Sequence, residues 1–311
     1  MVDIFLKTLP FFALIALGYG AARRGFFPPE ATGYLTKFVF YFALSAMLFR
    51  FSANLSLAEV IDWPLVWAYL LGSLAVYLLA TVVALVRKRG ILEGAVEAQC
   101  AVIGNVGFLG IPMLILLLGE RSVGPVMLVL AVDLIVFGSL IVILITGARD
   151  GRMSLGILRS IAIGLVKNPM IVSFELGLCW SATDEPLPAP VNDFLGILGA
   201  EATPGALFAI GASLADKSAE RISVAGWLTF CKLVLHPVAV GALALFVFAV
   251  DPYSAAVMIA TAALPVAGNV YIIARHYDVA PSRASASIFV STVVSVVSLS
   301  VVIAWVTKTL L

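Results

Sequence analysis

Apolar runs of about 20 residues recur along nearly the whole chain, and this feature most constrains what it can fold into. Hydrophobic residues make up 62% of the 311 residues, charged residues only 12%, and the mean hydropathy is +1.11. So few polar side chains cannot cover the surface of a water-soluble domain. The net charge of +1 gives no electrostatic footprint for a nucleic acid. The chain is therefore expected to be solvated mainly by lipid and to bind no nucleic acid.

A helix that crosses a bilayer needs about 20 mostly apolar residues, and this length identifies ten spans. They cover residues 3–22, 32–52, 63–86, 93–118, 123–146, 168–183, 190–215, 222–250, 253–276 and 284–307. The runs are too long for the strands of a membrane barrel and lack their alternating polarity. The sequence predicts an all-α membrane protein with ten transmembrane helices.

Lys and Arg are concentrated in the loops that follow the odd-numbered spans. Of the 19 Lys and Arg residues, 13 lie in or at the edge of these loops, whereas the loops after the even-numbered spans hold only Arg121. Positively charged loops stay in the cytoplasm. Both termini are therefore expected on the extracytoplasmic side of a cell membrane.

The longest loop divides the spans into two sets of five. The first half is expected at residues 1–147, a cytoplasmic connecting loop at 148–167 and the second half at 168–311. The later part of the loop fits a simple linker or a short helix at the membrane surface equally well. Because five is odd, the halves enter the membrane from opposite sides. Any similarity between them is then an inverted repeat, an architecture of many secondary transporters.

Such a similarity exists in spans four and nine. The tripeptide Gly-Asn-Val occurs at residues 104–106 and again at 268–270. Each copy has a proline within eight residues, Pro112 in the first case and Pro265 in the second. These matches predict two inverted five-helix repeats in which spans four and nine correspond.

The composition of these two spans predicts broken helices. Span four holds three glycines and a proline within nine residues: Gly104, Gly107, Gly110 and Pro112. In a helix interior they would cost about 1 kcal/mol per glycine and about 3 for the proline. The freed backbone groups are tolerated in hydrocarbon only where they face protein or a wet cavity. Helix N-termini at such breaks favour an anion, and Asn105 and Asn269 can bind a carboxylate or exposed backbone. Close helix packing by small residues is the alternative explanation.

The residues around these asparagines resemble signatures of the auxin efflux carrier family, which includes bacterial carriers and the plant PIN auxin exporters. The likeness is carried by residues 104–112 and 264–271, is extended by residues 203–214 and 291–295, and covers nearly the whole chain. It implies ten helices, with spans four and nine crossing at their broken centres. It also implies a scaffold of spans 1, 2, 6 and 7, often dimeric, and a mobile transport domain of spans 3–5 and 8–10. The short connecting loop resembles the bacterial members, which implies a bacterial inner membrane.

The resemblance implies small organic anions as substrates, such as malate, malonate or auxin-like acids, carried by elevator-type alternating access. The candidate substrate-binding residues are Ser45, Gly104, Asn105, Gly107, Gly268, Asn269 and Tyr271, and the candidate helix-breaking residues are Gly110, Pro112 and Pro265. Ser45 is a departure, because the family often has a proline at this point of span two. Substrate contacts near Ser45 are therefore not transferred from the family.

Charged groups at membrane depth are costly, which makes them candidates for function. Asp133 in span five and Glu201 in span seven are candidates to carry a proton or cation, and Lys232 in span eight is a candidate counter-ion for a substrate carboxylate. Ion pairs inside the bundle are the alternative for Asp133 and Glu201 and the favoured interpretation for Lys232. The other charged side chains considered are Glu97 and His236, for which internal pairing is favoured, and Lys37, which is expected to snorkel to the interface.

The sequence favours a secondary active or facilitative carrier of small organic anions. It holds no P-loop, so ATP is not the direct energy source, and it holds neither a G-x-S-x-G nucleophile nor an H-E-x-x-H zinc pair. An enzyme, a metal site and a cofactor other than a coupling H⁺ or Na⁺ are therefore not expected. A sodium-coupled symporter is the main alternative, and a channel or a receptor is a weaker one.

Overall fold

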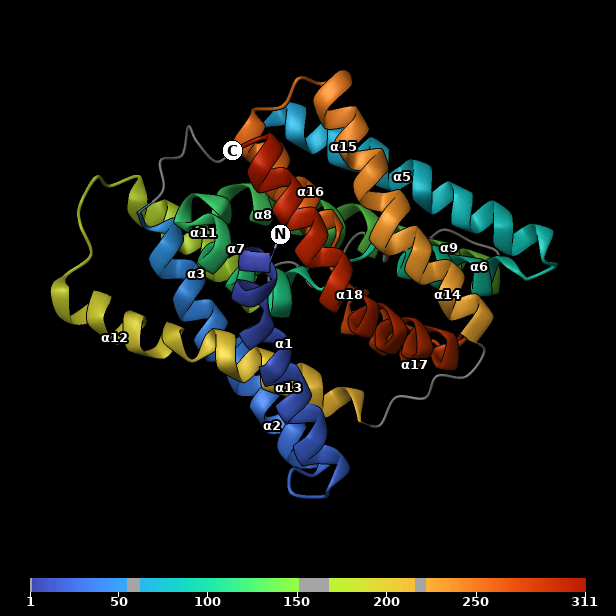
Figure 1. The fold of residues 1–311 in the computed structure, drawn as a ribbon, viewed down its shortest axis with the longest axis horizontal. Coiled ribbons are helices and arrows are strands. Elements are labelled where there is room, and N and C mark those ends of the chain that lie inside the picture. The colour runs from blue at the N-terminus through green and yellow to red at the C-terminus, as the bar shows by residue number, and fades with distance from the viewer. Residues whose placement is uncertain (1, 55–61, 151–167, 216–221) are drawn as a thin grey trace.

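The structure, a computed structural model, describes residues 2–54, 62–150, 168–215 and 222–311. Every regular element within these ranges is a helix (Figure 1). By length and composition, six helices of the described ranges could cross a membrane: Pro29–Ser52, Trp63–Val86, Glu120–Ala148, Ala189–Leu214, Ser223–Phe246 and Pro281–Thr309. The other four predicted spans coincide with helices that are interrupted or short, or, for the first span, with a helix of which Leu9–Arg23 is the apolar stretch. An all-helical membrane protein is confirmed, whereas ten crossings remain a prediction.

The helices of the first half fall within the first five apolar runs. They are α1 (Val2–Arg23), α2 (Pro29–Phe38) with η1 (Val39–Ala43) and α3 (Leu44–Ser52), α5 (Trp63–Val86), α6 (Ile91–Val102) followed by η2 (Val106–Gly110) and α7 (Ile111–Leu118), and η3 (Glu120–Ser122) with α8 (Val123–Val132), η4 (Asp133–Phe137) and α9 (Gly138–Asp150). Most of the predicted connecting loop, residues 151–167, lies outside the described residues.

The helices of the second half fall within the last five apolar runs. They are α11 (Pro169–Ser181), α12 (Ala189–Ala200) with α13 (Ala202–Leu214), α14 (Ile222–Phe230) with η5 (Cys231–Leu235) and α15 (His236–Phe246), α16 (Pro252–Ala262), α17 (Gly268–His276) and α18 (Pro281–Thr309). The boundaries agree with the predicted runs to within a few residues because polar caps and loops interrupt the apolar sequence there.

Three helix starts share one local pattern, a polar cap followed by a proline. The side chains of Asp62, Asn168 and Asp251 each accept a hydrogen bond from a backbone N–H in the first turn of α5, α11 and α16. Proline lies in the first turn of each of these helices, where its missing N–H costs nothing. These starts therefore follow from sequence alone.

Within the described ranges four helices contain a wider π turn, and two of these turns end two residues before a proline. η2 precedes Pro112 and η5 precedes Pro237. Proline cannot donate to the carbonyl four residues earlier, and the wider turn accommodates that loss: the Ile111 N–H bonds to the Val106 carbonyl. Gly110 and Ile111 keep right-handed helical backbone. The prediction that Gly110 and Pro112 break helix four is therefore wrong, because the helix continues through both.

The helices pack as two groups (Figure 1). The first group holds α1, α2, α3, α11, α12 and α13, in which α1 lies on α13, and α3 lies on α11 and α12. The second group holds α5 to α9 and α14 to α18, in which α5 lies on α6 and α15, and α18 lies on α14 and α16. The α1–α13 contact depends on glycine: a Cβ atom at Gly18 or Gly211 would collide with the backbone of the facing helix, at Phe208 or Ile15 respectively.

Candidate functional site

Helices four and nine are each interrupted near their middle. α6 ends at Val102, and the chain is non-helical over residues 103–105 before η2 begins. α16 ends at Ala262, and residues 263–267, including Pro265, are non-helical before α17 begins. Each predicted span is therefore two separate half-helices.

The two interruptions cross and bond to each other. Gly104 and Val266 form an isolated antiparallel bridge. The Asn105 N–H donates to the Pro265 carbonyl at 2.8 Å, and the Ala267 N–H donates to the Ile103 carbonyl at 3.0 Å. Backbone groups freed by one break are thus satisfied by the other, as a non-helical segment within a membrane protein requires.

Two half-helices have their N-termini at this crossing. η2 continues into α7 from Val106, and α17 runs from Gly268. The first N–H groups of a helix have no partner within it, and they give that end a partial positive charge. The crossing therefore presents two positive helix ends without using an Arg or Lys side chain.

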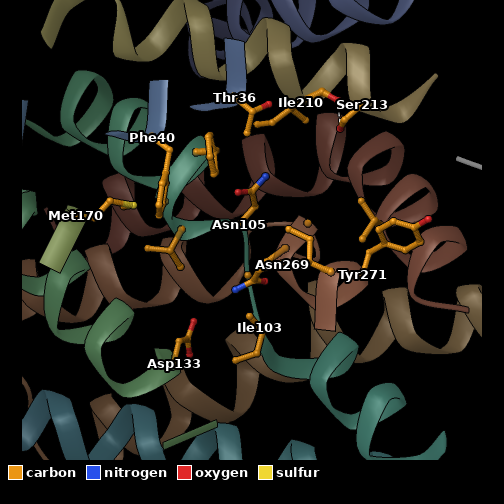
Figure 2. A pocket seen from close by; sticks show the side chains of 18 of the residues that line it. Thr36, Phe40, Ile103, Asn105, Asp133, Met170, Ile210, Ser213, Asn269 and Tyr271 are labelled. Carbon is orange, nitrogen blue, oxygen red and sulfur yellow. Dashed lines mark hydrogen bonds between the residues drawn. The ribbon is translucent and has the colours of Figure 1, made fainter. Parts of the chain in front are cut away.

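A cavity of about 600 Å³ lies at the crossing (Figure 2). This volume is typical of a small-molecule site. Its polar lining comes from both groups of helices: Thr36, Lys37, Tyr41, Gln99, Asn105, Asp133, Asn168, Ser213, Asn269, Tyr271 and Thr292. Among the described residues, Lys37 and Asp133 are the charged groups of this lining. Lys37, expected only to snorkel, therefore belongs to the cavity wall.

Most of the residues predicted from the two signatures meet at this cavity. Its lining includes Gly104, Asn105, Gly107, Gly268, Asn269 and Tyr271, together with Asp133. Figure 2 shows the side chains of Asn105, Asn269, Tyr271 and Asp133 among those around the cavity. A Cβ atom at Gly268 would meet nothing within 4 Å. The start of α17 is thus open to a ligand.

Two predicted residues do not reach the cavity. The Ser45 hydroxyl donates to the Phe40 carbonyl of its own helix at 3.2 Å, and this bond occupies the hydroxyl. The bond lies at the π turn η1, where the backbone hydrogen bonds depart from the α-helical pattern. Glu201 is exposed at the junction of α12 and α13. Neither side chain lines the cavity. Their predicted roles in substrate binding and ion coupling are therefore not supported by their positions.

Lys232 is also absent from the cavity lining, because it is fully buried behind the crossing. Its Nζ atom donates to the carbonyl of Ala262, the last residue of α16. It also lies 3.1 Å from His236 Nδ1, and His236 Nε2 lies 2.8 Å from Ser73 Oγ. As an ammonium, Lys232 is the donor in both of its hydrogen bonds. His236 Nδ1 therefore accepts, so the ring is neutral and its Nε2–H donates to Ser73 Oγ. Lys232 thus stabilises the carboxyl end of a half-helix and is not placed to meet a substrate carboxylate.

Asp133 lies at the first residue of η4 and is 5% exposed. The Tyr69 hydroxyl donates to its Oδ1 atom at 2.8 Å. Its Oδ2 atom has no hydrogen-bond partner among the described residues, and neither does Oε1 of Gln99. Both residues line the cavity. Two side chains of the cavity lining therefore each carry a buried acceptor oxygen that has no donor among the described residues.

Glu97 forms the internal ion pairs that the sequence favoured. It is fully buried, with Arg283 Nη1 2.7 Å from its Oε1 atom and a second pair to Arg87. These contacts tie α6 to α18 and to the end of α5. A buried carboxylate with two cationic partners is satisfied, so Glu97 has a structural role.

Several cavity residues were not identified from sequence. Gln99 lies four residues before the first break, in a helix whose other polar side chains are Glu93 and Glu97, and an uncharged amide so close to the break was an available signal. Phe40 stacks on Phe108 with ring centroids 5.9 Å apart and joins η1 to η2. Aromatic residues are too frequent in membrane spans for Phe40 to have been selected by its type.

Comparison with known proteins identifies the chain's relatives. The sequence pattern of the family described as "Membrane transport protein" matches residues 3–303. The chain belongs to this family. The match confirms the resemblance to the auxin efflux carriers and makes the chain a multi-pass membrane transport protein.

Two curated relatives of this membrane transport protein cover nearly its whole length. A Rhizobium meliloti (strain 1021) protein named "Putative malonate transporter" is 31% identical over 307 residues, 96% of this chain and 95% of the relative. An Escherichia coli (strain K12) protein named "Uncharacterized transporter YfdV" is 27% identical over 306 residues, 94% of each chain. Both share the length of this membrane transport protein, so the crossing lies within the aligned part of each.

Proposed function

We propose that the protein is a secondary carrier of small organic anions and that it binds them at the crossing of the two broken helices. The observation that carries this proposal is the cavity into which two helix starts and two asparagines converge. Helix N-termini attract anions, and the Asn105 and Asn269 amides supply further donors to a carboxylate. Malonate is a reasonable first substrate to test, because the name of one relative mentions it.

The lining explains why an anion could bind reversibly. The two helix ends carry partial charges, and a single full positive charge, on Lys37, lies in the wall among the described residues. A site built from partial charges and neutral amides gains less binding energy than a paired Arg and Lys would give. A carrier needs such moderate affinity, because it has to release its substrate on the other side.

The packing supports two inverted repeats of five spans. α1, the first helix of the first half, packs on α13 in the second half, and α11, the first helix of the second half, packs on α3 in the first half. A pseudo-two-fold exchange of the halves produces such reciprocal contacts. The interrupted spans four and nine also correspond under this exchange. We infer ten crossings, with the interrupted and short helices completing the six long ones.

The two packing groups support an elevator-type mechanism. The group of α1 to α3 and α11 to α13 matches the scaffold predicted from spans 1, 2, 6 and 7, and the other group matches the predicted transport domain. Both groups contribute to the cavity, through Thr36 and Ser213 on the first and Asn105 and Asn269 on the second. Movement of the second group along the first would carry the substrate with it. A homodimer through the scaffold, extracytoplasmic termini and a bacterial inner membrane complete the proposal.

Uptake into liposomes that contain the purified protein tests this function. A panel of labelled mono- and dicarboxylates, malonate and malate among them, is expected to include at least one saturable substrate. Asn105→Ala and Asn269→Ala are each expected to weaken its binding about tenfold, which corresponds to about 1.4 kcal/mol. Their melting temperatures should stay near that of the wild type, because both side chains face the cavity.

Asn54→Ala is the matched control, because this exposed asparagine follows the end of α3, donates to the carbonyl of Arg50 in the last turn of α3, and does not line the cavity. It should leave uptake unchanged. If no anion of the panel is taken up by protein that is folded and inserted, or if both cavity variants transport like the wild type, the proposal is wrong.

A further inference from the structure

The carboxyl group of Asp133 creates an electrostatic conflict in the cavity. Its ionised form would place a negative charge on the wall of the same cavity that is proposed to receive an anion. Like charges in a poorly hydrated site repel strongly. An anion therefore binds best when Asp133 is neutral.

The surroundings of Asp133 leave one oxygen available for neutralisation. Oδ1 already accepts the Tyr69 hydroxyl at 2.8 Å, whereas Oδ2 is buried, has no partner among the described residues and belongs to a cavity-lining side chain. The missing partner of an acceptor oxygen is a donor or a cation. A proton on Oδ2 would remove the charge and let Asp133 donate a hydrogen bond. Gln99 Oε1, the second acceptor without a donor, lines the same cavity.

The other charged and titratable groups around Asp133 are engaged elsewhere. Tyr69 of α5 holds Oδ1. Lys232 of η5 interacts electrostatically with Asp133 but bonds to Ala262 and His236, and the His236 ring of α15 packs 5.6 Å from that of Tyr69. On α6, Glu97 is paired with Arg87 and Arg283. Lys37 of α2 also lines the cavity but is exposed, and its Nζ atom lies 5.9 Å from the centre of the Tyr34 ring. None of these contacts occupies Oδ2.

We propose that Asp133 is the coupling site of the carrier, and that a proton bound to Oδ2 is carried together with the organic anion. The proposal rests on the proposed anion-carrier function and names its coupling ion. Protonation converts the carboxylate to a neutral acid, and the anion then binds at the crossing. After the movement both leave on the other side, and the carboxylate is restored.

A proton fits this site better than a divalent metal cation does, and the sodium gradient of the test below separates a proton from sodium. Hard divalent cations such as calcium and magnesium favour sites built from several oxygen ligands. The described residues hold no group of three or more His, Cys, Asp or Glu side chains that could bind a metal ion. Asp133 has a single open carboxylate oxygen, which suffices for one proton.

The linkage between the two ligands has a definite sign. If the proton raises anion affinity by some factor, the anion raises proton affinity by the same factor. Couplings of this kind are typically about 5- to 150-fold. Anion affinity of the wild type is therefore expected to fall by a factor in this range as the pH rises through the titration of Asp133.

The test uses liposomes that contain the full-length protein and a pH-sensitive dye in their interior. An imposed inward proton gradient is expected to drive accumulation of the anion, and uptake is expected to acidify the interior. Liposomes without protein correct for diffusion of the uncharged acid. Asp133→Asn has nearly the same shape and imitates the protonated group. It is expected to bind the anion with an affinity that no longer depends on pH, and to allow exchange without proton-driven accumulation.

Asp184→Asn is the matched control, because Asp184 is exposed in a turn and has a positive φ of 57° that asparagine tolerates. It should keep proton-driven uptake. Wild-type protein that transports the anion without moving protons, or that follows a sodium gradient instead, overturns the proton assignment while leaving the anion carrier intact. Loss of all anion transport in the wild type instead refutes the proposed function. If Asp133→Asn is poorly folded, proton movement by the wild type still decides the question.

Discussion

The two helix breaks lie side by side, yet they are stabilised by different means. Directly after the first break, in η2, glycines permit close contacts: a Cβ atom at Gly110 would lie 2.5 Å from Leu264 Cδ1, and one at Gly107 would lie 3.1 Å from Met170 Cε. At the second break, polar side chains from other helices bond to the backbone. Ser291 Oγ accepts the Val266 N–H at 3.0 Å, and Lys232 donates to the Ala262 carbonyl.

This difference explains how a membrane protein can keep two interrupted helices next to each other. The first break spans three residues, and two of its backbone groups, the Ile103 carbonyl and the Asn105 N–H, bond to the second, while the Asn105 carbonyl bonds to the turn that follows. The second spans five residues and includes a proline, so its backbone needs more partners than the first break can supply. The first break thus depends on the absence of side chains, and the second depends on their presence. Adding side chains should therefore destabilise the first break, whereas removing polar side chains should destabilise the second.

The largest effect is expected at Lys232. Lys232→Met keeps the apolar stem but removes the donor, which leaves the Ala262 carbonyl and His236 Nδ1 without their partner. Each buried acceptor left unsatisfied costs about 1–3 kcal/mol, so we expect a loss of about 3 kcal/mol or more in stability. Transport should be lost as well, because the end of α16 would shift at the crossing. Thermal unfolding in detergent and liposome uptake measure the two effects.

Lys308→Met is the matched control, since Lys308 lies in the last turn of α18, away from the crossing. It should change neither measurement appreciably. If Lys232→Met has wild-type stability, then Lys232 does not stabilise the second break, and the contrast between the breaks is lost.

An intermediate effect is expected from a pair of glycine-to-alanine substitutions. Gly110→Ala adds a methyl group against fully buried Leu264, and overpacking of this kind costs about 1–3 kcal/mol. Gly268→Ala adds its methyl group to open cavity space, so stability should stay the same or rise slightly, because alanine is the better helix former. The same methyl group should lower anion affinity. Equal destabilisation by both variants would show that the two glycines do not differ in packing.

Local signals made much of the fold predictable from the sequence. The helix boundaries follow from apolar length and from polar caps such as Asp62 and Asp251, whose effects extend over only a few residues. The Gly-Asn-Val repeat likewise predicted that Asn105 and Asn269 lie at the same site. These predictions needed no knowledge of which helices touch.

The remaining features depend on contacts between distant segments. Pro112 is the strongest helix breaker of span four, yet the break lies at residues 103–105, because the backbone there is satisfied by residues 265–267 across the crossing. The bond from Lys232 to Ala262 joins residues 30 positions apart. Its role could not be read from span eight alone. Glu201 lies near the middle of predicted span seven, but it is exposed because α12 ends and α13 begins at this residue.

The smallest effect is expected at Ser291, where one hydrogen bond is at stake. Ser291→Ala leaves the buried Val266 N–H without an acceptor, which should cost about 1 kcal/mol. Ser295→Ala, one turn later on α18, removes a hydroxyl that donates to the Thr292 carbonyl of its own helix, and it should cost clearly less. Because the second break has several polar supports, losing Ser291 alone should slow transport without abolishing it. Equal melting temperatures for the two variants would mean that the Ser291 bond contributes nothing, and that Lys232 and the backbone pairing alone hold the second break.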